Sequence, residues 1–165
     1  MVEEHPPASQ AAEDPLLNAV PSPAPLVGTW AATGEVLGDD GDVVGTLTGT
    51  DTYRWLGPTV VHEVDVRVDG RVDGRVDGRR TQALEMLEPY DAARGAFPTR
   101  AYDDAGGVDV STATVDAGGV WTFRARGARA TLEVAPDGAS MRATWVRETA
   151  TGDVPWMRLR WTRTG

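Results

Sequence analysis

His62 is the residue of this chain best suited to acid–base chemistry, and it lies within an apolar stretch. Val60, Val64 and Val66 occupy alternate positions around it, so in a strand they share one face with the imidazole. An unperturbed imidazole titrates near pH 6.5. Because a buried wall seldom carries an imidazole without a partner, we expect His62 to project inward and to meet a polar group from a facing strand.

The expected partners of His62 are, in order, Glu85, Arg100 and Tyr102. Together with Arg124, they are polar residues on segments that should flank or face a cavity. Alternation alone does not tell whether these side chains face the cavity or the solvent. We therefore predict His62, Arg100, Tyr102 and Arg124 as ligand contacts. His62 and Glu85 are the predicted acid–base pair if the protein is an enzyme.

Six tryptophans are many for a chain of 165 residues. Each is expected first as a core residue. Together they could also line an aromatic pocket, because small-molecule sites are mostly apolar with few convergent polar groups. Trp121 and Trp145 are the two that we predict to contact a ligand.

Missing residue types exclude much chemistry. There is no cysteine, and all 16 basic residues are arginines. Thiolate nucleophiles, cysteine-bound metals, lysine Schiff bases and the P-loop are therefore excluded. The second of the two histidines, His5, lies in the N-terminal segment, so a two-histidine metal site inside the folded domain is excluded too. We expect neither a metal nor a cofactor.

The net charge of −9 argues against nucleic acid as a partner, because phosphate contacts need a basic surface. The last third of the chain is locally basic and could bind an anion or face the acidic region of another copy, which would make a homodimer. No apolar run approaches the roughly 20 residues of a membrane-spanning helix, and the acidic start is unlike a signal peptide. The expected location is the cytoplasm, without membrane contact.

Ten short strand-like runs are separated by turns rich in glycine and aspartate. Alternation of polar and apolar residues recurs along them, and no segment is typical of a long helix. A meander this long removes its exposed edges by closing. We therefore predict an all-β fold, a closed or nearly closed antiparallel barrel, with strands at about 28–37, 44–56, 59–68, 81–88, 97–102, 108–115, 120–126, 128–134, 141–149 and 156–163.

The predicted barrel domain covers residues 26–165. Residues 1–25 carry six prolines and no apolar periodicity, so we expect them to form a disordered tail. Between the third and fourth strands, the tetrapeptide Val-Asp-Gly-Arg occurs three times over residues 68–79. Its aspartate spacing fits no known calcium loop. We interpret it as a duplication tolerated in a surface loop, since extending a loop costs little entropy.

The order of several short motifs resembles that of a known group. Gly28-x-Trp30 on the first strand is similar to the opening of calycins, the superfamily of lipocalins and fatty-acid-binding proteins. Residues 57–163 also resemble a bacterial family of calycin-like barrels of unknown function, through segments 80–86, 90–91, 97–103 and 156–157. The resemblance implies that Trp30 packs against an arginine of the last strand, Arg160 or Arg163. Nitrobindin-like haem barrels share the opening, but their C-terminal haem-binding histidine is missing here.

Two functional hypotheses follow. The first is a small-molecule-binding barrel that holds a largely apolar ligand with a polar end in its interior. The second is a cofactor-independent enzyme of specialised metabolism, an isomerase, cyclase or lyase, that uses His62 or Glu85 as general acid or base in a dry cavity. A perturbed His62 that meets a carboxylate or tyrosine would favour the enzyme, and a purely apolar cavity would favour the binder. The absence of lysine, cysteine and a metal cluster favours the binding protein over the enzyme.

Overall fold

The computed structural model describes residues 20–72, 75–76 and 78–165. The predicted tail falls mostly on residues 1–19, which lie outside the described residues. Residues 20–25 are described, and Ala24 and Pro25 begin a 3-10 helix, Ala24–Leu26, that precedes the first strand. The boundary of the barrel domain at residue 26 stays a prediction.

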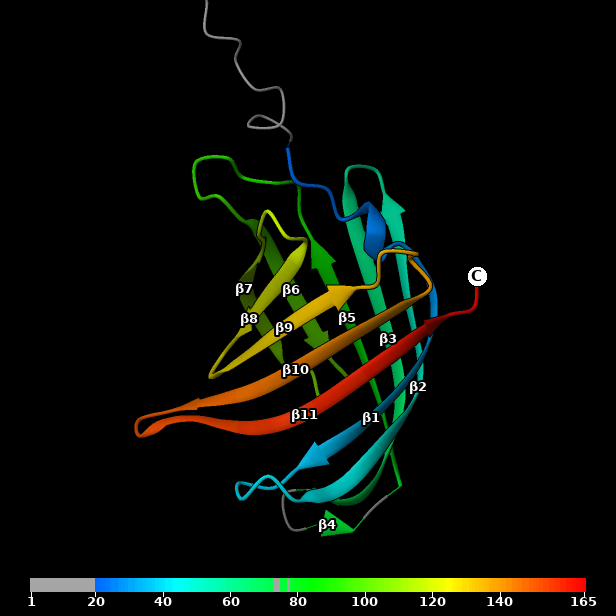
Figure 1. The fold of residues 1–165 in the computed structure, drawn as a ribbon, viewed down its shortest axis with the longest axis vertical. Coiled ribbons are helices and arrows are strands. Elements are labelled where there is room, and N and C mark those ends of the chain that lie inside the picture. The colour runs from blue at the N-terminus through cyan, green and yellow to red at the C-terminus, as the bar shows by residue number, and fades with distance from the viewer. Residues whose placement is uncertain (1–19, 73–74, 77) are drawn as a thin grey trace, which may run out of the picture.

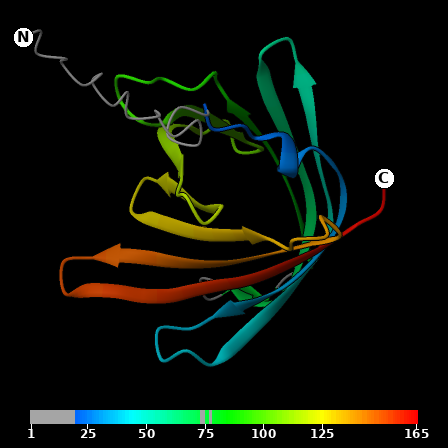
Figure 2. The same cartoon turned by 45° about the horizontal axis from the view of Figure 1, so that its top comes forward.

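The described residues form an all-β fold, as predicted, in which a closed meander of ten antiparallel strands makes a barrel (Figures 1 and 2). Each of these ten strands pairs with the next of the ten, and the first, Gly28–Leu37, pairs with the last, Gly152–Arg163, which closes the sheet on itself. The short strand β4, Arg75–Val76, pairs only with the end of β3. The ten barrel strands are β1 Gly28–Leu37, β2 Val43–Leu56, β3 Thr59–Val72, β5 Arg79–Leu87, β6 Phe97–Asp103, β7 Val108–Val115, β8 Val120–Ala125, β9 Ala128–Val134, β10 Ser140–Thr149 and β11 Gly152–Arg163.

The last strand starts four residues earlier than predicted. Gly152 pairs with Thr149, so the turn of the β10–β11 hairpin is tighter than the sequence suggests. Proline is unusual inside a sheet because it has no backbone N–H to donate a hydrogen bond to the neighbouring strand, so Pro155 is unexpected within β11. It lies opposite Val146, where the register shifts by one residue. Such a bulge accommodates the proline without ending the strand.

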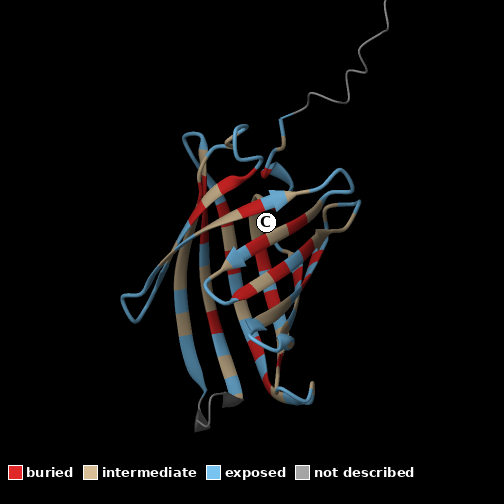
Figure 3. Ribbon diagram, turned by 90° about the vertical axis from the view of Figure 1, so that its left-hand side faces the viewer, coloured by how far each residue is buried: buried red, intermediate tan, exposed pale blue. Residues whose placement is uncertain are grey.

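Buried and exposed residues alternate along the strands, as the colouring of Figure 3 shows. On β2, the threonines at positions 46, 48 and 50 face the solvent, whereas Leu47, Asp51 and Tyr53 face the interior and are buried. On β3, Val60, His62 and Val66 are buried on the inward face. Period-two alternation therefore places an acidic residue, Asp51, on the same face as the apolar side chains of its strand.

The 3-10 helix lies at one end of the barrel, where its Leu26 is fully buried beside Trp30 (Figure 1). The Trp30 indole nitrogen donates a hydrogen bond to the Leu26 carbonyl over 2.8 Å. The guanidinium carbon of Arg163 lies 4.1 Å from the centroid of the Trp30 ring, a cation–π contact. Arg163 also donates to the carbonyls of Val27 and Gly138. Of the two arginines that the calycin resemblance implied, Arg163 is thus the one that packs on Trp30.

We expect deletion of residues 71–78 to leave the fold intact and to change the free energy of unfolding by no more than about 1 kcal/mol. In the structure, Val68 pairs with Arg79 across β3 and β5. The deletion would join these strands through Asp69-Gly70 alone, a two-residue sequence that strongly favours a tight hairpin. Urea unfolding of the parent and the shortened protein measures the difference. A loss of several kcal/mol, or stability of the parent that depends on calcium, would show that the repeat is structural.

Candidate functional site

A cavity of about 350 Å³ lies inside the barrel, lined mostly by apolar side chains. Its walls come from strands on opposite sides of the barrel, including β2, β3, β9, β10 and β11. The apolar lining consists of Ala32, Leu47, Val64, Val66, Val68, Phe123, Ala130, Leu132, Ala143, Trp145, Trp156, Met157, Leu159 and Trp161. Such a volume with apolar walls is typical of a small-molecule site.

The polar groups of this cavity gather around His62. Strand register places Tyr53 and Glu85 directly opposite His62, on the two neighbouring strands β2 and β5. The Tyr53 and His62 rings stack with their centroids 3.9 Å apart and their planes 7° apart. The Nδ1 atom of His62 lies 3.2 Å from Glu85 Oε2. The predicted inward orientation of His62 and its contact with Glu85 are confirmed.

The second partner of His62 is Asp51, which sequence reasoning missed. The His62 Nε2 atom lies 3.5 Å from Asp51 Oδ2, and the same oxygen accepts a hydrogen bond of 2.5 Å from the Trp161 indole. The other oxygen, Asp51 Oδ1, is buried and has no hydrogen-bond partner among the described residues, and neither has His62 Nε2 at this distance. The signal that could have found Asp51 is its position on the inward face of β2, two residues before Tyr53.

The charge of His62 follows from these neighbours. Burial lowers the pKa of the imidazole, but the approach of Asp51 to 3.5 Å, the hydrogen bond with Glu85 and the charges of both carboxylates outweigh that effect and raise the pKa to about 9. Burial, with the charges of Asp51 and Glu85, raises the pKa of the Tyr53 hydroxyl well above 10. At neutral pH His62 is therefore an imidazolium between two carboxylates, and Tyr53 is neutral.

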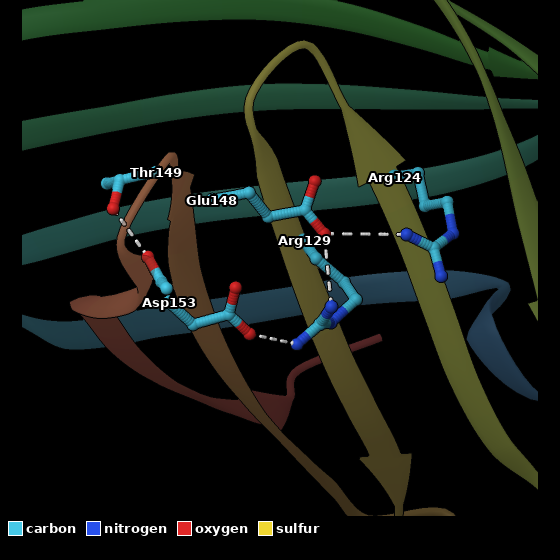
Figure 4. A network of polar contacts seen from close by, with 6 residues as sticks. Arg124, Arg129, Glu148, Thr149 and Asp153 are labelled. Atoms are coloured by element: carbon cyan, nitrogen blue, oxygen red, sulfur yellow. Dashed lines mark hydrogen bonds and ion pairs between the residues drawn. The ribbon is translucent and has the colours of Figure 1, made fainter.

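Three of the four polar residues predicted as ligand contacts lie outside the cavity lining. Arg100 and Tyr102 are on the face of β6 opposite to the buried Phe97 and Thr99, and Arg100 pairs with Glu88 over 3.1 Å. Arg124 is exposed on β8. Figure 4 shows it beside Arg129, and both guanidinium groups contact Glu148, over 3.5 and 3.0 Å. The pleat turns alternate residues to opposite faces, which is why these arginines and Tyr102 point away from the cavity.

Of the two tryptophans predicted as ligand contacts, one lines the cavity and the other does not. Trp145 lines the cavity, and its ring meets Trp156 edge-on with 5.9 Å between centroids. Trp121 is buried but does not line the cavity. It packs between Phe97 and Phe123 and borders a different hollow, next to Pro21, Pro25 and Arg163.

The cluster around His62 does not have the arrangement of a metal site. Its two carboxylates contact opposite nitrogens of the ring, so the three side chains do not converge on one point. Within the described part of the chain, no group of three histidine or acidic side chains has metal-binding geometry. In the same residues, no helix reaches the length and hydropathy needed to cross a bilayer.

Comparison with known proteins identifies structures of similar fold but no family to which the chain belongs. The sequence matches no protein family and no curated protein. Among solved structures, the S-type phycobiliprotein lyase from Guillardia theta superposes with a TM-score of 0.59 over 86% of this chain and 90% of its own, at 8% identity. A redesigned β-barrel, mFAP1, bound to DFHBI, aligns with a TM-score of 0.45 over 85% of this chain and 96% of its own, at 13% identity. The likeness to the lyase, at 8% identity, shows a shared fold alone.

Proposed function

We propose that this protein binds a small, largely apolar molecule inside the barrel, with the polar end of that molecule at Asp51, His62 and Glu85. The observation that carries this proposal is the 350 Å³ cavity whose apolar walls converge on one polar cluster. The shared fold with the S-type phycobiliprotein lyase is compatible with such a role. Membership of the bacterial calycin-like family belongs to the same proposal.

Among the predicted contacts, we keep His62 and Trp145 as ligand-binding residues and add Asp51, Glu85 and Trp156. Arg100, Tyr102 and Arg124 would need an outer-surface ligand to serve in that role, because each lies away from the cavity. We further propose that binding needs no cofactor, nucleic acid or membrane, and that it takes place in the cytoplasm. A homodimer through the basic last third stays a prediction that the oligomeric state in solution would test.

A second candidate function, acid–base catalysis, is favoured by one observation: a perturbed imidazole that meets Glu85 inside a cavity. A general acid or base works best when its pKa is near the working pH. With a pKa of about 9, His62 holds its proton at neutral pH and has no free electron pair to act as a base. The carboxylates left for that task are Asp51, which is 5% exposed, and Glu85, which is 24% exposed. We therefore rank binding first.

We expect Ala130→Phe to weaken ligand binding at least tenfold, because its ring would occupy the cavity that Ala130 lines. The matched control is Thr131→Phe, at the next position of β9, which faces the solvent. Calorimetric titration with 2-(1-naphthyl)ethanol, a neutral probe with an apolar body and one hydroxyl, measures the effect. Equal affinity in both variants, or no saturable binding to the parent, would contradict the proposal.

Native mass spectrometry of protein purified from its own host separates the two candidate functions. A binding protein should retain one small molecule and release it unchanged on denaturation. An enzyme should convert the molecule that it retains, and His62→Gln should stop the conversion.

A further inference from the structure

The cavity carries an unbalanced negative charge. Asp51 and Glu85 contribute two carboxylates, and His62 contributes one positive charge. Among the residues that the structure describes, no arginine lines the cavity, and the chain has no lysine. Apolar walls strengthen the field of such an unbalanced charge, because little water screens it.

The arginines of the neighbouring strands are engaged on the outer surface. Arg80 pairs with Asp65, Arg142 pairs with Glu133, and both guanidinium groups are largely exposed. Arg147 stacks over the ring of Trp156, 5.0 Å from its centroid, and does not line the cavity. These arginines therefore lie outside the cavity, whereas the carboxylates of Asp51 and Glu85 lie inside it.

A buried acceptor inside the cavity lacks a donor. The Asp51 side chain is 5% exposed, and its Oδ1 has no hydrogen-bond partner among the described residues. The other buried side-chain atom without a hydrogen bond, His62 Nε2, lies 3.5 Å from Asp51 Oδ2, so an acceptor already faces it. A carboxylate only accepts hydrogen bonds, and buried polar groups are normally paired. The missing group is thus an N–H or O–H donor, and Asp51 is one of the residues that line the cavity.

We infer that the ligand carries a cationic hydrogen-bond donor, such as a protonated amine or amidine, on an apolar body, and that the cavity rejects the matching carboxylate. This inference rests on the proposed function, because it names the chemical class of the molecule held at that site. A cation supplies both the charge and the donor that the cavity lacks. The Trp145 and Trp156 rings in the same lining also favour a cation over an anion. A carboxylate would bring a third negative charge and leave Asp51 Oδ1 unpaired.

Three probes with one apolar body test the inference: 2-(1-naphthyl)ethylamine, 2-(1-naphthyl)ethanol and 1-naphthylacetic acid. We expect calorimetric titration at pH 7 to show the amine binding at least tenfold more tightly than the acid, with the alcohol between them. Equal affinities for all three, or tightest binding of the acid, would overturn the inference and leave the proposed function standing. No binding of any probe would overturn both.

Variants connect the preference to the carboxylates. Asp51→Asn should reduce the preference for the amine over the acid at least tenfold, and Glu85→Gln should reduce it in the same direction. Glu63→Gln is the matched control, because Glu63 neighbours His62 on β3 but faces outward and pairs with Arg54. Circular dichroism verifies that each variant is folded, and Glu85→Gln carries the test if Asp51→Asn does not fold. An unchanged preference in the folded variants would overturn the inference.

Discussion

We expect His62→Phe to lower the free energy of unfolding by about 3 kcal/mol at pH 7. The variant keeps an aromatic ring against Tyr53 but removes the positive charge between Asp51 and Glu85. Removing one partner of a buried ion pair leaves uncompensated charge and costs roughly 3–5 kcal/mol. The lower end applies because Glu85 is partly exposed. From the sequence alone, this substitution would be expected to leave the fold intact and to weaken binding. The two carboxylates found beside the ring change that expectation.

The control for this prediction removes the carboxylates as well. In the triple variant His62→Phe, Asp51→Asn, Glu85→Gln, no buried charge is left unpaired, so most of the lost stability should return. Urea unfolding monitored by tryptophan fluorescence gives the free energies. A loss below about 1 kcal/mol in the single variant, against the range expected for buried pairs, would mean that His62 is not the counter-charge of this cluster.

The second large effect is a loss of stability in mild alkali. His62 has a pKa of about 9 in the folded protein, above its ordinary value of 6.5, so between these values the folded state holds a proton that the unfolded chain has released. The stabilisation is complete below pH 6.5 and is lost as the pH rises through 9. We expect the free energy of unfolding to fall by about 3 kcal/mol across that window.

The titratable groups that face His62 are not expected to add a stability change of their own between pH 6.5 and pH 9. They are Asp51 and Tyr53 from β2 and Glu85 from β5. Burial raises the pKa of Tyr53 well above its ordinary value of 10. Urea unfolding between pH 6 and pH 9 measures the effect, and His62→Gln, which keeps His5 unchanged, should flatten the profile. Equal stability of the parent protein at both ends of the range would refute the assignment.

Much of the fold could be predicted because alternation and turn chemistry are local properties of the chain. The valines around His62 fix which face of β3 is buried, and the turns after Leu37 and Val115 end strands where the structure ends them. The pairing of Trp30 with Arg163 could be anticipated only through the calycin resemblance, because it joins the first strand to the last. The register shift opposite Pro155 could not be anticipated, since it depends on how β10 and β11 meet.

At the candidate site, the alternation of polar and apolar residues did not predict which side chains reach the cavity. Arg124 and Trp121 were both predicted as ligand contacts, yet they are three residues apart on β8 and so face opposite sides of the sheet. Likewise, Phe97 is buried on β6, which turns Arg100 and Tyr102 outward. If Phe97 on β6 and Trp121 on β8 are taken as inward-facing, the alternation of each strand predicts that Arg100, Tyr102 and Arg124 face outward. The pattern did contain Asp51, on the inward face of β2 with Leu47 and Tyr53.

By itself, the amino-acid sequence determined the approximate strands and the inward imidazole, because both follow from period-two alternation and turn residues close in the chain. Closure of the sheet followed from the number of strands in the meander, whereas the inward faces of β6 and β8 did not follow from the pattern. The tertiary structure decided what the imidazole meets. Asp51, His62 and Glu85 come from three strands, and Trp161 reaches Asp51 from a strand 110 residues away along the chain. Strand register and barrel curvature bring these groups together, and both are properties of the closed sheet as a whole.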